Sequence, residues 1–135
     1  MQVSEVMSKS IVFADISDSI KKVAELMRDH DIGSIPVCDN GKPCGFVTDR
    51  DIVISCVADG NSLEQPISEA MNSEFVTIEH DEDVTEAVSL MGAKKISRLV
   101  VVEEEKPVGI VSLQDLSLNI NSPDIKSEIL TEIKQ

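Results

Sequence analysis

The chain has 135 residues, of which 41% are hydrophobic, and its 25 acidic and 12 basic residues give a formal net charge of −13. This composition is ordinary for a soluble globular domain, whereas so negative a chain repels nucleic-acid backbones and anionic membranes and excludes them as main partners. No apolar run reaches the roughly 18 residues of a membrane span. The first residues lack the basic start and apolar stretch of a secretory signal, so we expect a cytoplasmic protein.

The first predicted elements are a short strand and a helix. Residues 11–13 are apolar and indicate the strand. Ile20, Val23 and Met27 then recur at the spacing of one helix face. Because Ser19 stands before them as a helix-starting residue, we predict an amphipathic helix over residues 19–30.

A β-hairpin and a second helix are predicted next. The apolar segments 34–38 and 42–48 flank Asn40-Gly41, and Asn-Gly between apolar runs is the strongest short signal for a hairpin turn. Apolar residues between Ile52 and Val57 then continue as a helix. The predicted order of elements is therefore β-α-β-β-α.

The chain then repeats this pattern. Residues 67–116 align without a gap on residues 3–52, 64 positions earlier, with thirteen identical pairs. Composition alone would produce about three such pairs. The halves are therefore a tandem repeat, in which each unit is one supersecondary structure.

The repeat defines the expected fold class and domain limits. We predict an α/β fold of the α+β type with one repeat over residues 1–62 and the other over 63–120. A repeat of about 55 residues does not comfortably bury enough surface to stand alone, so we expect the two to pack as a pseudo-twofold pair with a shared core. Residues 121–135 place Pro123 at a helix start and predict a C-terminal amphipathic helix, which could cover the pair or bind a second chain.

Both repeats place a hydroxyl residue at the junction of the hairpin with the second helix, and an Asp three positions later. These pairs are Thr48 with Asp51 and Ser112 with Asp115. The spacing is that of a capping box, which needs no ligand. The same geometry also suits a nucleotide, because a hydroxyl can donate to phosphate and a carboxylate can accept from two ribose hydroxyls. Spacing alone favours the cap.

The context of these pairs resembles a known family. The chain is similar over residues 3 to about 118 to the cystathionine-β-synthase (CBS) domain family, and specifically to its tandem pair, the Bateman module. The motifs that carry the resemblance are Val6-Met7-Ser8, Ala70-Met71-Asn72, Ala24-Glu25-Leu26-Met27, Ala87-Val88-Ser89-Leu90-Met91, Ile35-Pro36-Val37 and the two Gly-x-x-Ser/Thr-x-x-Asp segments. The second repeat departs from it with Val100 in place of proline and an acidic turn, Glu103-Glu104-Glu105.

The resemblance implies a regulatory binding module, not an enzyme. Such pairs hold adenosyl compounds (AMP, ADP, ATP or S-adenosylmethionine) in two clefts between the repeats, and commonly form twofold dimers. It therefore implies an adenine nucleotide as ligand, a homodimer and an effector protein that the sequence does not identify. The sequence also leaves open which adenosyl compound binds, and whether Mg²⁺ accompanies it.

The family arrangement also implies ligand contacts. One cleft uses Thr48, Arg50 and Asp51 with Ile78, Glu79, His80, Ile96, Ser97 and Arg98. The other uses Ser112, Gln114 and Asp115 with Ala14, Asp15, Ile16, Ile32, Gly33 and Ser34. The hydroxyls contact phosphate, the carboxylates hold ribose, and backbone near Ile32 and Ile96 reads the adenine. Because Arg50 and Arg98 both fall in the first cleft, we expect that cleft to prefer the more charged nucleotide.

Two other classes of function stay open. A ligand-free structural or dimerisation module would use the hydroxyl–carboxylate pairs only as caps. An enzyme or redox sensor would use Cys44 or Cys56, but neither His30 nor His80 forms a catalytic or metal-binding cluster with the three cysteines. If Asn40-Gly41 is the turn, Cys38 pairs with Pro43 and its disulfide to Cys44 is disfavoured.

Overall fold

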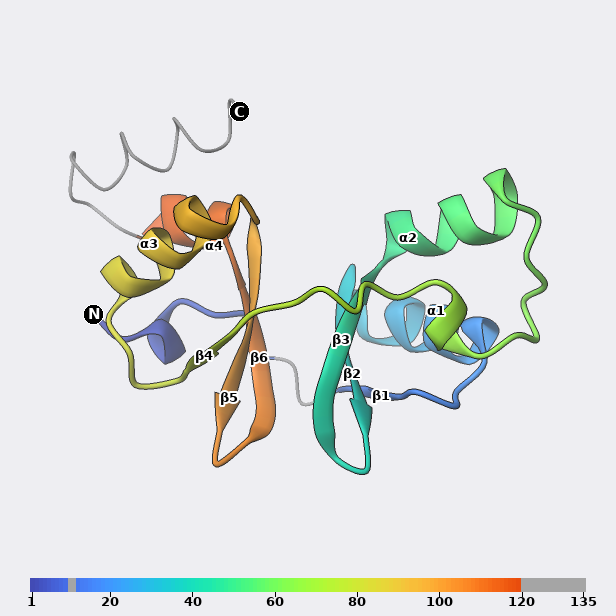
Figure 1. The fold of residues 1–135 in the computed structure, drawn as a ribbon, viewed down its shortest axis with the longest axis horizontal. Helices are drawn as coiled ribbons and strands as arrows, with labels where there is room; N and C mark the ends of the chain where they lie inside the picture. The colour runs from blue at the N-terminus through green and yellow to red at the C-terminus, as the bar shows by residue number, and fades with distance from the viewer. Residues whose placement is uncertain (10–11, 120–135) are drawn as a thin grey trace. The chain divides into compact units, whose positions relative to one another are not determined.

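A computed structural model describes residues 1–9 and 12–119, so the predicted C-terminal helix lies outside the described residues. The chain divides into two compact units, which we name after their junction hydroxyls. The described residues of the Thr48 unit are 12–75 and 105–107, and those of the Ser112 unit are 1–9, 76–104 and 108–119. Each unit holds one three-stranded sheet with its helices on one face (Figure 1). The mixed α/β class is confirmed.

In the Thr48 unit the sheet has the order β1-β2-β3. Strand β1 runs parallel to β2, and β2 runs antiparallel to β3. The elements are β1 (Ala14–Asp15), α1 (Ile20–His30), β2 (Ser34–Asp39), β3 (Lys42–Thr48), α2 (Asp49–Val53), a π turn (Ile54–Ala58) and a 3-10 turn (Ile67–Glu69). Asn40 and Gly41 both have positive φ, at 53° and 80°, as the predicted Asn-Gly hairpin turn requires.

The Ser112 unit repeats this order. Its sheet is β4-β5-β6, with β4 parallel to β5. The elements are a 3-10 turn (Val3–Glu5), β4 (Thr77–Glu79), α3 (Val84–Lys94), β5 (Arg98–Glu103), β6 (Lys106–Ser112, of which 108–112 belong to this unit) and α4 (Leu113–Asn119). Glu104 and Glu105 turn this hairpin with positive φ values of 51° and 66°, although neither is glycine or asparagine.

The predicted first helix is confirmed, and the first strand is shifted. Ser19 caps α1 by accepting a hydrogen bond from the Lys22 N–H, and the helix ends at His30. Strand β1 begins at Ala14, after residues 12 and 13 of the predicted strand, because ladder pairing with β2 starts with Ala14 opposite Val37. Residues 10 and 11 lie outside the described part of the chain. The apolar run predicted a strand, whereas a strand is defined by its hydrogen-bond partner, and Phe13 of this run is exposed.

Each unit takes its first turn from the other repeat of the sequence. Val3 belongs to the first repeat but is fully buried in the core of the Ser112 unit, where its N–H donates to the Glu82 carbonyl at 2.8 Å. Ile67 belongs to the second repeat but is fully buried in the core of the Thr48 unit. Its N–H donates a hydrogen bond to the Asp18 carbonyl at 2.7 Å. The compact units therefore differ from the sequence repeats at their leading segments, while the limits 1–62 and 63–120 stay predictions.

The described core residues form two clusters, one within each unit. The Thr48 cluster comprises Ala14, Ile20, Val23, Met27, Ile35, Val37, Val47 and Ile67. The Ser112 cluster comprises Val3, Val6, Ile78, Val84, Ala87, Val88, Met91, Leu99, Val101, Val111, Leu113 and Leu116. These cores are aliphatic, and they hold the sheet ends on which the candidate site is built. Among the described helices, none has the length and apolar character needed to cross a membrane.

Candidate functional site

Thr48 ends β3 and caps α2 in the Thr48 unit. Its Oγ1 accepts a hydrogen bond from the Asp51 N–H at 3.2 Å, and Asp51 Oδ2 accepts one from the Thr48 N–H at 2.8 Å. The side chain of Thr48 is buried, with 8% of its surface exposed. This reciprocal pair is a capping box, as the spacing predicts.

Ser112 and Asp115 form the same pair at the β6–α4 junction. The Asp115 N–H donates to Ser112 Oγ, and the Ser112 N–H donates to Asp115 Oδ2, both at 3.0 Å. Both carboxylates are half-buried. The structure therefore builds two equivalent hydroxyl–carboxylate pairs, 64 residues apart in the chain.

The capping boxes leave ligand-binding capacity on the same side chains. In each box the hydroxyl acts as an acceptor, so its proton can still be donated to an anion. Each box also uses only one carboxylate oxygen, Oδ2, so Oδ1 can still accept a hydroxyl proton. The cap and the binding site are thus compatible, because the cap holds the two groups in place.

The end of α1 places Gly33 and Ser34 next to Thr48. Asp31 leaves the helix in the left-handed conformation, with φ 52°, and the Ile32 N–H returns to the Met27 carbonyl at 3.0 Å. This helix ending reverses the chain and anchors Ile32 on the core. The Gly33 carbonyl then accepts from the Asp49 N–H at 3.1 Å, and Ser34 lies opposite Thr48 in the ladder.

The Ser112 unit repeats this loop. Lys95 has φ 55°, and the Ile96 N–H donates to the Met91 carbonyl at 3.0 Å. The Ser97 carbonyl accepts from the Leu113 N–H at 3.0 Å. Ile96 and Ser97 therefore lie beside the Ser112 junction, within the same unit.

Four predicted site residues lie farther along the sheets. Ala14 is opposite Val37, and the Ile16 N–H donates to the Cys38 carbonyl. Val37 is three residues from Ser34, or about 10 Å along a strand, toward the hairpin turn that follows β2. Ile78 on β4 and His80 just after it occupy the equivalent places beside β5: Ile78 is opposite Val101, and the His80 N–H donates to the Val102 carbonyl. Within its own unit, none of these four reaches the junction.

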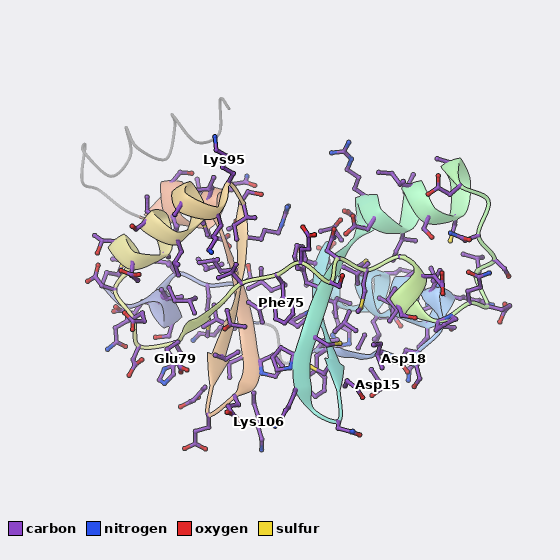
Figure 2. The ribbon with its side chains drawn as sticks, viewed as in Figure 1. Asp15, Asp18, Phe75, Glu79, Lys95 and Lys106 are labelled. Carbon is purple, nitrogen blue, oxygen red and sulfur yellow. The ribbon has the colours of Figure 1, made fainter. Side chains whose placement is uncertain are left out.

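The cationic residues predicted near the site are exposed and unpaired. Arg50 lies on α2, Arg98 begins β5, and Lys95 lies at the turn between α3 and β5 (Figure 2). No ion pair joins Arg50, Arg98, Lys94 or Lys95 to an acidic group within residues 1–9 and 12–119. Each unit thus carries one of the two predicted arginines, and both are free to meet an anion.

Sequence reasoning missed one residue of the site, Asn72. Its side-chain Nδ2 donates to Asp51 Oδ2 at 2.7 Å, although 21 residues separate the two in the chain. Asn72 follows the 3-10 turn Ile67–Glu69 and makes an isolated bridge with Phe46 on β3. Its position in the repeat, matched with Ser8, was visible, but no local pattern connects it to Asp51.

The cysteines and histidines form no further site in the part of the chain that is described. Cys38, Cys44 and Cys56 are free thiols, and Cys38 lies opposite Pro43, as predicted. Burial raises the pKa of the Cys38 thiol to about 11, and it also raises the pKa of Cys44. His80 Nε2 lies 3.6 Å from Glu103. No three His, Cys, Asp or Glu side chains among the described residues could together hold a metal ion.

Two segments of the chain, residues 3–57 and 67–122, match the CBS domain. These matches cover most of the chain, and the chain belongs to the CBS domain family. It is a CBS domain pair, a regulatory class of module.

Similar proteins span nearly the same length. The "CBS domain-containing protein YhcV" of Bacillus subtilis is 34% identical over 131 residues, which are 97% of this chain and 94% of that one. The CBS domain pair of protein MJ0100, solved with 5′-methylthioadenosine and S-adenosyl-L-methionine, is 29% identical, with a TM-score of 0.73, over 87% of this chain and 94% of that one. Hypoxic Response Protein I, solved with two coordinated zinc ions, is 26% identical, with a TM-score of 0.71, over 89% of this chain and 99% of that one.

Proposed function

We propose that the chain is a sensor that binds an adenosyl compound and regulates a partner without catalysing a reaction. The observation that carries this proposal is the pair of hydroxyl–carboxylate boxes at matched junctions. Each box presents a hydroxyl donor and a free carboxylate oxygen, which complement the phosphate and the ribose diol of a nucleotide. A similar CBS pair was solved with two adenosyl compounds, which supports this ligand class.

Each junction residue has a proposed role. Thr48 and Ser112 donate to phosphate, and Asp51 and Asp115 accept from the ribose hydroxyls. The loops at Ile32–Ser34 and Ile96–Arg98 supply backbone groups for the adenine edge. Arg50 and Gln114 follow the hydroxyls on α2 and α4. Contacts from Ala14, Ile16, Ile78 and His80 stay predictions.

The exposed cations favour an adenosyl compound that carries phosphate. Arg50 and Arg98 are free guanidinium groups in a chain of net charge −13, and guanidinium binds phosphate through paired hydrogen bonds. We therefore propose AMP, ADP or ATP ahead of S-adenosylmethionine, which carries a positive sulfonium. We also propose that one of the two sites prefers the more charged nucleotide.

A thermal-shift panel tests the proposal. The protein is heated with AMP, ADP, ATP, S-adenosylmethionine, 5′-methylthioadenosine and, as a control, GMP. A ligand at one hundred times its Kd adds about 2.7 kcal/mol to the stability of the folded state, which is a shift of several degrees for a domain of this size. The absence of a shift with every adenosyl compound would refute the proposal.

The variants Asp51→Asn and Asp115→Asn separate binding from capping. Asn keeps an oxygen that can accept the backbone N–H of the cap, but it loses the charge that strengthens hydrogen bonds from ribose hydroxyls. We expect the double variant to keep its melting temperature without ligand and to lose the ligand-dependent shift. A double variant that binds normally would assign the boxes to capping only.

The competing function is a ligand-free dimerisation module. The capping boxes support it, because they explain both hydroxyl–carboxylate pairs without any ligand. We propose a homodimer under either function, and a cytoplasmic location. Light scattering with and without AMP measures whether the oligomeric state depends on ligand, and such a dependence would contradict a ligand-free dimerisation module.

A further inference from the structure

Asn72 fixes the carboxylate of Asp51 in the Thr48 unit. Two donors converge on Asp51 Oδ2, the Thr48 N–H at 2.8 Å and Asn72 Nδ2 at 2.7 Å. Both donors lie on the same oxygen, so the rotamer of Asp51 is defined from two directions. Oδ1 is left as the acceptor for a ligand hydroxyl.

The backbone of Asn72 is itself held in place. Its N–H donates to the Phe46 carbonyl at 2.9 Å, and its carbonyl accepts from the Phe46 N–H at 3.2 Å. The neighbouring Gly45 allows this approach, because a Cβ there would collide with the Asn72 carbonyl oxygen. Asn72 therefore reaches Asp51 from a fixed starting point, which makes the hydrogen bond a property of the fold.

The equivalent residue of the Ser112 unit is Ser8. Its backbone makes the same bridge, with hydrogen bonds of 2.9 and 3.3 Å to Ile110. Serine is shorter than asparagine, and in the described residues its hydroxyl makes no hydrogen bond to Asp115. Asp115 Oδ2 keeps the donor of the capping box, the Ser112 N–H. Asp51 is thus held by two donors and Asp115 by one, although the backbone around them is equivalent in the two units.

We infer that Asn72 is a positioning residue that gives the site at Thr48 the higher affinity for a ribose diol. This inference rests on the proposed function. A carboxylate held by two donors loses less conformational freedom when the ligand binds than Asp115, which is held by one donor. The cost of immobilising one such side chain corresponds to an affinity difference of about 2- to 10-fold.

Exchanging the two residues tests the inference. Each site is measured alone by calorimetry, the Thr48 site in an Asp115→Asn background and the Ser112 site in an Asp51→Asn background. The probes are AMP and 5′-methylthioadenosine, which share the ribose diol. We expect Asn72→Ser to weaken binding about 2- to 10-fold in the first background, and Ser8→Asn to tighten it similarly in the second.

A third probe separates positioning from a structural role. AMP that lacks both the 2′- and 3′-hydroxyls cannot use Asp51 through its ribose, so Asn72→Ser should leave its affinity unchanged. A merely structural role for Asn72 would weaken all three probes together. Equal affinities before and after the exchange, with AMP still bound, would overturn the inference alone. No binding of AMP or 5′-methylthioadenosine by the unsubstituted protein would overturn the proposed function and the inference together.

Discussion

The Thr48 and Ser112 units have nearly the same backbone but different side chains at its most demanding points. Their first long helices end in a left-handed residue, which is Asp31 in one unit and Lys95 in the other. Their hairpins turn through Asn40-Gly41 and Glu104-Glu105. Packing of the two cores therefore imposes the backbone, and local residues only make it easier or harder to adopt.

The difference that bears on function is at the junctions. Both units have the capping box, but only in the Thr48 unit does a described residue beyond the box, Asn72, bind its carboxylate. A duplicated module keeps its backbone because the cores depend on it. It can then diverge at residues that contact neither core, and such residues set the properties of each site.

The largest expected losses of stability come from substitutions in the leading segments that the two repeats exchange. Ile67→Ala removes a fully buried side chain from the Thr48 core and should cost about 2–5 kcal/mol of stability. Its match, Val3→Ala, should cost about 2 kcal/mol, at about 0.8 kcal/mol for each lost methylene-sized group plus a small cavity.

Hydrogen exchange of peptides from each unit shows where the stability is lost. Ile67→Ala should expose α1 and β2, and Val3→Ala should expose α3 and β5. The division into units would be contradicted if each substitution instead affected its own sequence repeat.

The glycines at the bridges come next. Gly109→Ala would place a Cβ 2.6 Å from the Ser8 carbonyl oxygen, and Gly45→Ala would bring one against the Asn72 carbonyl. We expect each to cost about 1–3 kcal/mol, because the leading segment must move away from the strand. Urea unfolding measures the loss, and Gly45→Ala should also weaken AMP binding at Asp51. Wild-type stability in both variants would show that the bridges form differently.

Exchanging the two hairpin-turn sequences should change the stability in opposite directions. Replacing Glu104-Glu105 by Asn-Gly puts residues that adopt the left-handed conformation readily in place of two glutamates, and should raise stability by about 1 kcal/mol. The reverse exchange, Glu-Glu for Asn40-Gly41, should lower it by a similar amount. Thermal unfolding of both variants checks the sign. A change of the same sign in both would contradict the role given to turn conformation.

The smallest effect concerns the buried thiol of the Thr48 unit. Burial raises the pKa of Cys38 from 9.0 to about 11, so the folded state keeps its proton when the unfolded state loses it. The stabilisation from the protonated thiol is complete below pH 9 and is lost as pH rises toward 11. At pH 8 we expect iodoacetamide to label Cys38 far more slowly in the folded than in the unfolded protein, as mass spectrometry can measure. Rapid labelling at pH 8 would contradict this burial.

Much of the fold could be predicted because its signals are local. Helical spacing from Ile20 to Met27, the Asn40-Gly41 turn and the capping-box spacing each act over a few residues, and the structure has all three. Cys38 opposite Pro43 followed from the turn alone. The duplication was equally visible, since it depends only on comparing the sequence with itself. The two hydroxyl–carboxylate pairs could be found for the same reason.

The tertiary structure decided what depends on distant contacts. Val3 and Ile67 pack on the core of the other repeat because their hydrogen-bond partners, at Glu82 and Asp18, lie there. Ala14 and Ile78 lie away from the junctions because ladder register with β2 and β5 sets their positions. Asn72 reaches Asp51 across 21 residues through a bridge to Phe46. The sequence by itself determined the elements and their duplication, since these follow from local backbone preference. Segment exchange and the support of each carboxylate arise only when separate segments share one core.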